Sequence, residues 1–210
     1  GAPASRATPP TGRAFVYDGS AAGVPVSPSL TLSDPVDPAT AHFGASVASA
    51  GDVDGDGYAD AIIGAPADIS NDTARGSAYL YHGSAAGLAV DPAVTLDTSI
   101  PDVQLGFSVA STGDVNGDGY ADVIVGAPAT WFGTPRVGSG LVYYGSAAGI
   151  PASASVTFDD PGYEPSGFGW SVASAGDANG DGYPEVLVGG APVGVPVYGG
   201  SAAGLPSAPS

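Results

Sequence analysis

The 210-residue sequence contains no cysteine and no lysine, and each absence narrows what the chain can be. Without cysteine, neither a disulfide framework nor a zinc-thiolate site is available. Four arginines stand against 21 acidic residues, and the formal net charge of -17 argues against nucleic acid and anionic membranes as partners. No apolar run approaches the roughly 20 residues of a membrane span, so we expect no membrane insertion.

Glycine and proline, in contrast, are abundant, with 34 and 20 copies. Both residues interrupt helices, so the composition favours short strands joined by many turns. The 43% of hydrophobic residues is enough for a packed core. The abundance of Ala, Gly, Asp and Pro suggests a bacterial source with a GC-rich genome.

An internal repeat organises the chain. A separate short segment, Gly-Ser-Ala-Ala-Gly, occurs four times in the chain and serves as a second marker of the repeat. The first acidic residue of the repeat recurs after 62 and then 63 residues, which is long enough for several strands per unit. The near copies are FGASVASAGDVDGDGYADAIIGAP (43–66), LGFSVASTGDVNGDGYADVIVGAP (105–128) and FGWSVASAGDANGDGYPEVLVGGAP (168–192).

Each unit is predicted to contain four strands, which in the first complete unit lie at Ala45–Ala50, Asp60–Ala65, Ser77–Tyr81 and Ala93–Leu96. The second is an apolar run that suits burial on both faces, whereas we expect the third to be half exposed. Repeated four-stranded sheets bury their faces by packing against one another around an axis. The predicted fold is therefore all-β, with β-propeller blades of four antiparallel strands. A β-sandwich is the alternative.

The repeats divide the single domain, 1–210, into a partial blade (1–42), two complete blades (43–104 and 105–167) and an incomplete blade (168–210). Strands of the partial blade are expected near Arg13–Asp18 and Ser29–Leu32. These three to three and a half blades are too few to close a ring. We expect either a homo-oligomer, in which the first blade of one chain completes the last blade of another, or a fragment of a larger propeller.

Each copy of the repeat carries a loop in which oxygen donors alternate with other residues, among them glycines. This spacing lets the side chains converge on one centre, and hard oxygen ligands select a hard cation. We predict three Ca²⁺ sites, each with four side-chain ligands and the backbone carbonyl of the loop tyrosine. The predicted ligands are Asp52, Asp54, Asp56, Tyr58 and Asp60 in the first loop, Asp114, Asn116, Asp118, Tyr120 and Asp122 in the second, and Asp177, Asn179, Asp181, Tyr183 and Glu185 in the third.

Other interpretations of these loops compete with a calcium site. An EF-hand is contradicted at its twelfth position, which needs a glutamate and is Ile63, Val125 or Val188, and by flanks that look like strands rather than helices. Magnesium is seldom held by this many protein oxygens. Polar Asp-Gly turns without any metal stay an alternative, which three copies at one period disfavour.

An aromatic residue and glycine opening a strand, the acidic loop, and an apolar strand ending in Gly-Ala-Pro together resemble the FG-GAP repeat of integrin α-subunit propellers. The resemblance covers nearly the whole chain. It departs at Leu105, which replaces the aromatic residue, and at Gly189-Gly190, where an extra residue is expected to form a bulge. The resemblance implies calcium loops on the lower face of the propeller and ligand recognition by loops of the opposite face.

By this resemblance, the recognition face is built from the loops after the second and fourth strands: 67–76, 129–138, 97–104 and 159–167. Among them, Trp131, Phe132 and Arg136 combine two aromatic side chains with an arginine, a set suited to contact with a ligand. The segments 71–75 and 163–164 are further candidates. Ordinary packing on a neighbouring blade is the alternative for each.

Catalysis has little support, because His42 and His82 occupy non-equivalent places in the repeat without an evident partner. A paired-carboxylate glycosidase stays open, although most acidic residues are explained as metal ligands. The leading hypothesis is a non-catalytic, calcium-binding module for protein interaction or adhesion, secreted or at the cell surface, where millimolar calcium fills sites of modest affinity. A carbohydrate-binding or enzyme-accessory propeller is the alternative, and a pure scaffold is a third. The ligand would be an unknown protein or glycan.

Overall fold

The computed structural model describes residues 12–36, 42–66, 76–100, 103–129, 138–160, 167–190, 195–206 and 208–209. These residues form thirteen strands, and they contain no helix that would cross a lipid bilayer. The strands are β1 (Arg13–Val16), β2 (Leu30–Ser33), β3 (Ser46–Gly51), β4 (Asp60–Ala65), β5 (Ser77–Tyr81), β6 (Val94–Leu96), β7 (Ser108–Gly113), β8 (Asp122–Ala127), β9 (Ser139–Tyr143), β10 (Val156–Asp159), β11 (Ser171–Gly176), β12 (Glu185–Gly189) and β13 (Val197–Tyr198).

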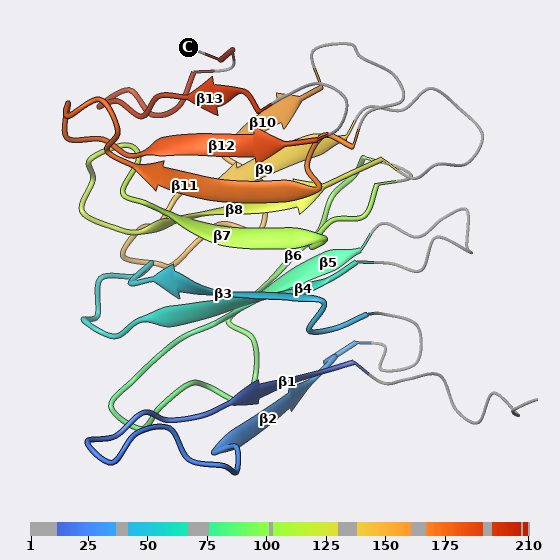
Figure 1. The fold of residues 1–210 in the computed structure, drawn as a ribbon, viewed down its shortest axis with the longest axis vertical. Coiled ribbons are helices and arrows are strands. Elements are labelled where there is room, and N and C mark those ends of the chain that lie inside the picture. The colour runs from blue at the N-terminus through green and yellow to red at the C-terminus, as the bar shows by residue number, and fades with distance from the viewer. Residues whose placement is uncertain are drawn as a thin grey trace, which may run out of the picture.

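The strands form four antiparallel sheets that stack in chain order, from β1 at the bottom of Figure 1 to β13 at the top. Two sheets have four strands each, β3-β4-β5-β6 and β7-β8-β9-β10. The first described sheet is β1-β2 and the last is β11-β12-β13. The prediction of an all-β fold with four-stranded antiparallel blades is confirmed, and the described sheets form an open row rather than a closed ring.

The observed strands differ from the predicted ones by at most two residues at their ends. Asp60–Ala65 and Ser77–Tyr81 have the predicted bounds, whereas the fourth strand begins at Val94. The two complete sheets share one register, in which Ser46 of β3 faces Gly64 of β4 and the equivalent pair recurs in β7 and β8. The near-identical sequences therefore form near-identical hairpins.

Both faces of the second strand in each complete blade are buried, as predicted. Ile62 and Ile63 of β4 belong to different apolar clusters. In β8, Val123 and Val125 join one cluster and Ile124 another. This alternation follows the two-residue period of a strand. Each cluster combines residues of two consecutive sheets, so no sheet buries its apolar side chains alone.

The third strand is also buried on both faces, and the prediction that it is half exposed is wrong. Tyr79 and Tyr81 of β5 are 3% and 1% exposed, and Ala78 and Leu80 are fully buried. The ring of Tyr79 packs against Phe43, with ring centroids 5.7 Å apart. Tyrosines alternating with aliphatic residues look amphipathic in sequence, but this blade has a neighbouring sheet on either side.

Two glycines of the repeat lie where neighbouring blades approach closely. A Cβ atom on Gly126 would overlap the carbonyl oxygen of Gly169, and one on Gly64 would overlap that of Gly106. Gly106 and Gly169 themselves have φ values of 85° and 88°, which favour glycine. Ser108 Oγ donates to the Gly169 carbonyl oxygen at 3.0 Å. The glycine near the start of one repeat thus contacts the glycine near the end of the second strand of the preceding repeat, across the boundary between blades.

A bulge ends the first strand of each blade, because the register shifts between Ser49 and Gly51 and equally in β7 and β11. The further bulge predicted at Gly189-Gly190 is absent from the described pairing of β11 with β12. Ser171 faces Gly189 in the register found in the other blades. The extra residue of the third repeat therefore follows the paired part of β12.

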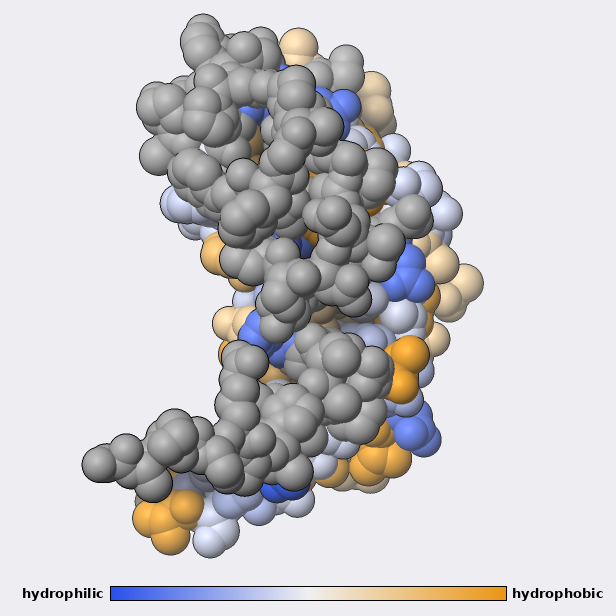
Figure 2. All heavy atoms as spheres, turned by 90° about the vertical axis from the view of Figure 1, so that its right-hand side faces the viewer, coloured by the Kyte–Doolittle hydropathy of each residue, from blue (hydrophilic) through white to orange (hydrophobic). Residues whose placement is uncertain are grey.

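The row of sheets is curved. Figure 2 looks onto the end of the blades opposite the acidic loops and shows the molecule hollowed on the side of β3, β7 and β11. These first strands of successive blades contact one another, β3 with β7 and β7 with β11. They are the innermost strands, as expected for blades arranged around a propeller axis.

The close approach at Gly126 predicts that Gly126→Ala destabilises the protein by about 1–3 kcal/mol or more, because a methyl group would force the blades apart. Urea unfolding at a fixed calcium concentration measures the loss. Gly19→Ala is the matched control, since a Cβ there meets nothing within 4 Å and the residue needs no positive φ. Equal stability of the two variants would contradict the assigned contact.

Candidate functional site

The three acidic loops join the first strand to the second in successive blades and lie along the left-hand edge of Figure 1. Each loop begins directly after the bulge glycine. Within the first loop, Gly55 and Gly57 have φ values of 75° and 90°, and Gly117 and Gly119 repeat them at 74° and 93°. Residues with a side chain rarely adopt this conformation. The glycines therefore allow the backbone to wrap around the carboxylates.

The first aspartate of each loop accepts the hydrogen bonds that close the loop. Asp52 Oδ1 accepts from the N–H groups three and four residues ahead, at 2.8 and 3.1 Å, and Oδ2 accepts from Gly57 at 2.9 Å. Asp114 and Asp177 make the same three bonds in their loops. An ionised carboxylate has about four acceptor positions, so these bonds leave it capacity for a cation.

The last acidic residue of each loop is buried, and in the first two loops it connects the loop to the rest of its blade. Asp122, fully buried, accepts from the N–H of Val115 in its loop at 2.9 Å and from Gly145 at 2.8 Å. Asp60 makes the equivalent pair of bonds, and Glu185 accepts its loop N–H at 2.6 Å. Gly145 begins a Gly-Ser-Ala-Ala-Gly segment. The second sequence marker thus supplies a backbone donor to the acidic loop.

Carboxylate oxygens converge in the first and third loops. In each, three acidic side chains bring one oxygen apiece within 4.8 Å of one another. Carboxylates this close repel unless a cation offsets their charge, and an all-oxygen donor set suits Ca²⁺. The residues therefore fit the ion that the sequence predicts. The converging groups are Asp52, Asp54 and Asp56 in the first loop and Asp177, Asp181 and Glu185 in the third.

In the second and third loops, an asparagine takes the place of Asp54 and relieves part of the repulsion between the carboxylates. Asn116 Nδ2 donates to Asp118 Oδ2 at 2.9 Å. Asn179 Nδ2 donates to Asp181 and to Glu185, each at 2.9 Å. Around Asn116, the described side chains include no triad of carboxylate or imidazole groups as close as those of the other loops.

The loop tyrosines turn their backbone toward the preceding aspartate. The N–H groups of Tyr58, Tyr120 and Tyr183 donate to the aspartates two residues earlier, at 2.8, 3.0 and 3.0 Å. That the backbone carbonyl oxygens of these tyrosines bind calcium stays a prediction.

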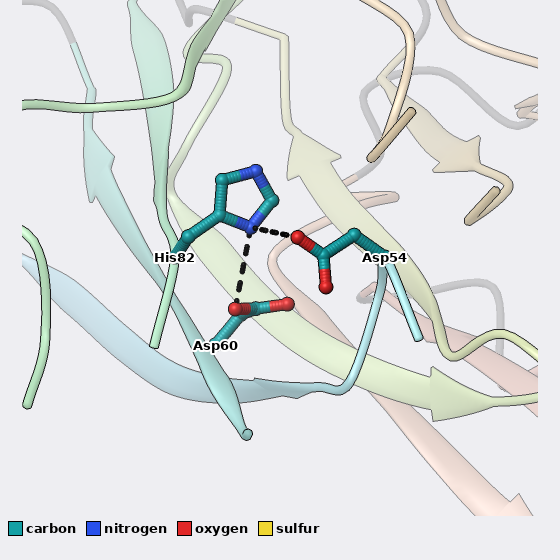
Figure 3. A group of neighbouring side chains, drawn as sticks. All are labelled: Asp54, Asp60 and His82. Atoms are coloured by element: carbon teal, nitrogen blue, oxygen red, sulfur yellow. Dashed lines mark hydrogen bonds and ion pairs between the residues drawn. The ribbon is translucent and has the colours of Figure 1, made fainter. Parts of the chain in front are cut away.

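His82 is the side chain of this region that the sequence analysis missed. It follows β5 and directs its ring into the first acidic loop (Figure 3). Its Nδ1 lies 3.2 Å from Asp54 Oδ2 and 3.3 Å from Asp60 Oδ1. The available signal was its position directly before Gly83, whose N–H donates to Asp60. The partner of His82, Asp60, lies 22 positions earlier in the sequence, so no local pattern identifies the pair.

Successive acidic loops contact each other across the boundary between blades. The backbone oxygen of Asp52 accepts from the N–H of Ala121 at 3.0 Å. The ring of Tyr120 covers Gly55, where a Cβ atom would lie 2.8 Å from Cε1, and Tyr183 covers the corresponding glycine of the second loop. The loops therefore form one continuous row.

The predicted recognition residues Trp131, Phe132 and Arg136 lie outside the described residues, as do the segments 71–75 and 163–164. At the end of the blades opposite the acidic loops, the described part of the chain presents an aromatic pair that the sequence analysis did not single out. Phe107 and Trp170, just before β7 and β11, are 40% and 39% exposed. Their rings are stacked, with centroids 6.4 Å apart and planes 21° apart.

The repeats match a known family model. The FG-GAP repeat model matches residues 43–81, 105–144 and 168–204, which is more than half of the chain, and each match contains one acidic loop. The chain belongs to the FG-GAP repeat family. Among similar proteins, integrin alpha-7 of Homo sapiens is 36% identical over 151 residues, and integrin alpha-IIb of Mus musculus is 34% identical over 154.

These alignments cover most of this chain but little of the relatives. They span 71% and 70% of the chain, against 12% of integrin alpha-7 and 15% of integrin alpha-IIb. The FG-GAP chain thus corresponds to a small part of the integrin α length.

Burial of Asp122 leads to a prediction of pH dependence. Burial, opposed by the N–H donors Gly145 and Val115 and reinforced by the charges of Asp118 and Asp114, raises the pKa of Asp122 to about 6. Because the folded state then holds this proton more tightly than the unfolded state, Asp122 should cost the calcium-free protein stability as pH rises from about 4 to about 6. The shift of about two units limits this cost to about 3 kcal/mol.

Urea unfolding in EDTA across this pH range, compared with Asp122→Asn, measures that contribution. The variant cannot titrate at this position, so its stability should fall less steeply between pH 4 and 6. Parallel pH profiles would contradict the assignment.

The asparagine in the second loop generates another prediction. Asn116→Asp should lower the melting temperature in EDTA, because it adds a charge beside Asp118, and should raise the calcium affinity of that loop, because it adds a charged ligand. Thermal melting in EDTA and calcium titration by calorimetry check the two signs. A variant that moves both quantities in the same direction would refute the assignment of Asn116 to a cation site.

Proposed function

We propose that this FG-GAP chain is a non-catalytic, calcium-stabilised module of an integrin-like propeller that serves protein interaction or adhesion. The observation that supports it best is the convergence of three carboxylates, Asp52, Asp54 and Asp56, in a turn closed by backbone hydrogen bonds to Asp52. A turn built only to reverse the chain needs no such accumulation of like charge. Related loops follow at the same place in the next two blades.

Calcium would be held at each loop by the predicted side chains, with the tyrosine carbonyl as a further ligand. The ion would offset the mutual repulsion of the carboxylates and connect the first aspartate of the loop to the buried acidic residue at its end. Three ions would remove six of the 17 excess negative charges of the chain. Calcium tolerates irregular, crowded oxygen shells, which distinguishes it from magnesium.

Recognition of a partner is proposed for the opposite end of the blades. The acidic loops are occupied in holding their own ion and contact each other, which leaves them poorly suited to bind a macromolecule. At the far end, Phe107 and Trp170 supply exposed, stacked aromatic surface just before two adjacent inner strands. Aromatic residues are enriched where proteins bind partners. Trp131, Phe132 and Arg136 are proposed to act with them.

Carbohydrate binding is the second candidate function, and the same aromatic pair favours it. Aromatic side chains bury apolar surface efficiently against a flat ligand, as they do at binding sites in general. A glycan array with the wild-type protein and Trp170→Ala separates the two functions. A sugar signal lost in the variant supports a lectin, whereas no signal from any glycan favours a protein partner.

The proposed setting is extracellular, where millimolar calcium fills sites of modest affinity. Further blades are proposed to extend the open row, from a second copy or from a longer FG-GAP chain. Because β12 already pairs with β13 through Val186 and Tyr198, we expect a second copy to pack sheet against sheet rather than add its β1 to β12. Light scattering with calcium and with EDTA tests self-association.

Calcium titration of the melting temperature tests the proposal. An ion that binds only the folded state stabilises it by about 2.7 kcal/mol per site at 100 times its Kd. For a chain of this size, that free energy corresponds to a rise of about 5–10 °C per site. Asp118→Asn should reduce the calcium-dependent rise, because it removes a charged ligand yet keeps an oxygen for the Tyr120 N–H.

Asp91→Asn is the matched control for this experiment, since Asp91 is exposed and lies outside the acidic loops. It should melt like the wild type at every calcium concentration. A wild-type melting temperature that does not change with millimolar calcium would rule out the proposed stabilisation.

A further inference from the structure

An imidazole nitrogen, from His82, faces the first acidic loop, and neither of the other two loops has a histidine at the equivalent place. His82 Nδ1 lies 3.2 Å from Asp54 Oδ2 and 3.3 Å from Asp60 Oδ1, and the three ligand atoms all lie within 4.8 Å of one another (Figure 3). One N–H proton cannot point along both directions at once. A single cation placed between the three atoms would contact all of them.

The imidazole is held in place by its surroundings. The backbone oxygen of His82 accepts from the N–H of Ala89 at 2.9 Å. Its ring packs against the next blade, where a Cβ atom on Gly149 would lie 3.3 Å from Cε1. Asp60, whose carboxylate is buried, is oriented by two backbone N–H groups. Two of the three donors are therefore fixed before any ion arrives.

The repeat shows that this arrangement is particular to one blade. The residue that precedes the Gly-Ser-Ala-Ala-Gly segment is His82 in the first complete blade but Tyr144 in the second and Gly199 in the third. Tyr144 directs its hydroxyl toward the next turn, where it accepts from the N–H of Leu205 at 2.9 Å. Asp54, one of the two aspartates beside His82, is likewise replaced by an asparagine in both other loops, Asn116 and Asn179.

We infer that Asp54, Asp60 and His82 form a site for a divalent transition metal ion of the zinc type, distinct in ligand chemistry from the all-oxygen calcium sites. Imidazole nitrogen is a preferred ligand of Zn²⁺ and its neighbours in the first transition row, whereas calcium takes oxygen ligands. Ligand atoms about 2.0–2.1 Å from a tetrahedral zinc ion are about 3.3–3.4 Å apart. The distances from Nδ1 to the two carboxylate oxygens are close to this value.

The inference rests on the proposed function in one respect only, because Asp54 and Asp60 are also predicted calcium ligands. Zinc and calcium would therefore exclude each other at the first loop. With zinc bound, the chain would take up two calcium ions instead of three. Zinc binding to the calcium-free protein does not depend on that competition, so the two proposals fail independently.

Isothermal titration of the tag-free, calcium-free protein with Zn²⁺ tests the site. We expect one zinc ion per chain, and a loss of affinity of at least about 100-fold in His82→Tyr, since even outer partners of metal ligands contribute 10–100-fold. The repeat itself uses tyrosine at this position, as Tyr144, so the variant should keep the fold. Asp54→Asn, which copies Asn116, should lose zinc affinity similarly while its loop keeps the donor types of the second calcium loop.

His42 supplies a matched control, because it is the other histidine of the chain and its Nδ1 lies 3.4 Å from the Pro66 carbonyl oxygen, outside the acidic loops. His42→Gln should bind zinc like the wild type. In the wild-type protein, zinc should shift the ¹⁵N resonance of one histidine Nδ1 and leave the other unchanged, a readout that needs no variant. Undiminished zinc affinity in His82→Tyr, or an unchanged His82 resonance, would overturn the inference.

Discussion

Each complete blade depends on its neighbours, because its second and third strands carry buried side chains on both faces. Burying one aliphatic or aromatic side chain stabilises a protein by about 1.5–3 kcal/mol, and β8 and β9 are buried along their whole length. A single sheet would leave one of these faces in water. Stacking is therefore the condition under which these strands are stable at all, and the close contact of Gly126 with Gly169 lets the sheets approach near enough to achieve it.

The same stacking determines the properties of the acidic loops. Because every hairpin has the same register, the loops emerge at one end of the molecule, where the carbonyl oxygen of Asp52 meets the N–H of Ala121 in the next loop. The stacked sheets also bury the last carboxylate of each loop, which raises the pKa of Asp122 and makes its charge costly without a cation. Packing energy in the core thus supports a concentration of negative charge that the loop alone would not hold.

Much of this arrangement follows from the sequence, and the exceptions share a physical cause. The repeat period, the strand positions and the convergence of the loop carboxylates depend on local patterns, and a pattern that occurs three times can be recognised without a structure. The burial of Tyr79 and Tyr81 depends on a sheet from another repeat, which local alternation does not reveal. The partnership of His82 with Asp54 and Asp60 joins residues more than 20 positions apart, and the exposed pair Phe107 and Trp170 meets only across a blade boundary.

The side chains proposed as metal ligands can differ between blades because the fold of the loop does not depend on every one of them. The turn is closed by the first carboxylate and by glycine conformations, which all three loops share. Two positions vary between the complete blades without a change of register. Asp54 of the first loop is Asn116 in the second, and His82, before the Gly-Ser-Ala-Ala-Gly segment, is Tyr144. A repeated scaffold of this kind separates the residues that close the loop from those that would select the proposed ion. Under these proposals, changes at the varying positions would alter metal preference one blade at a time.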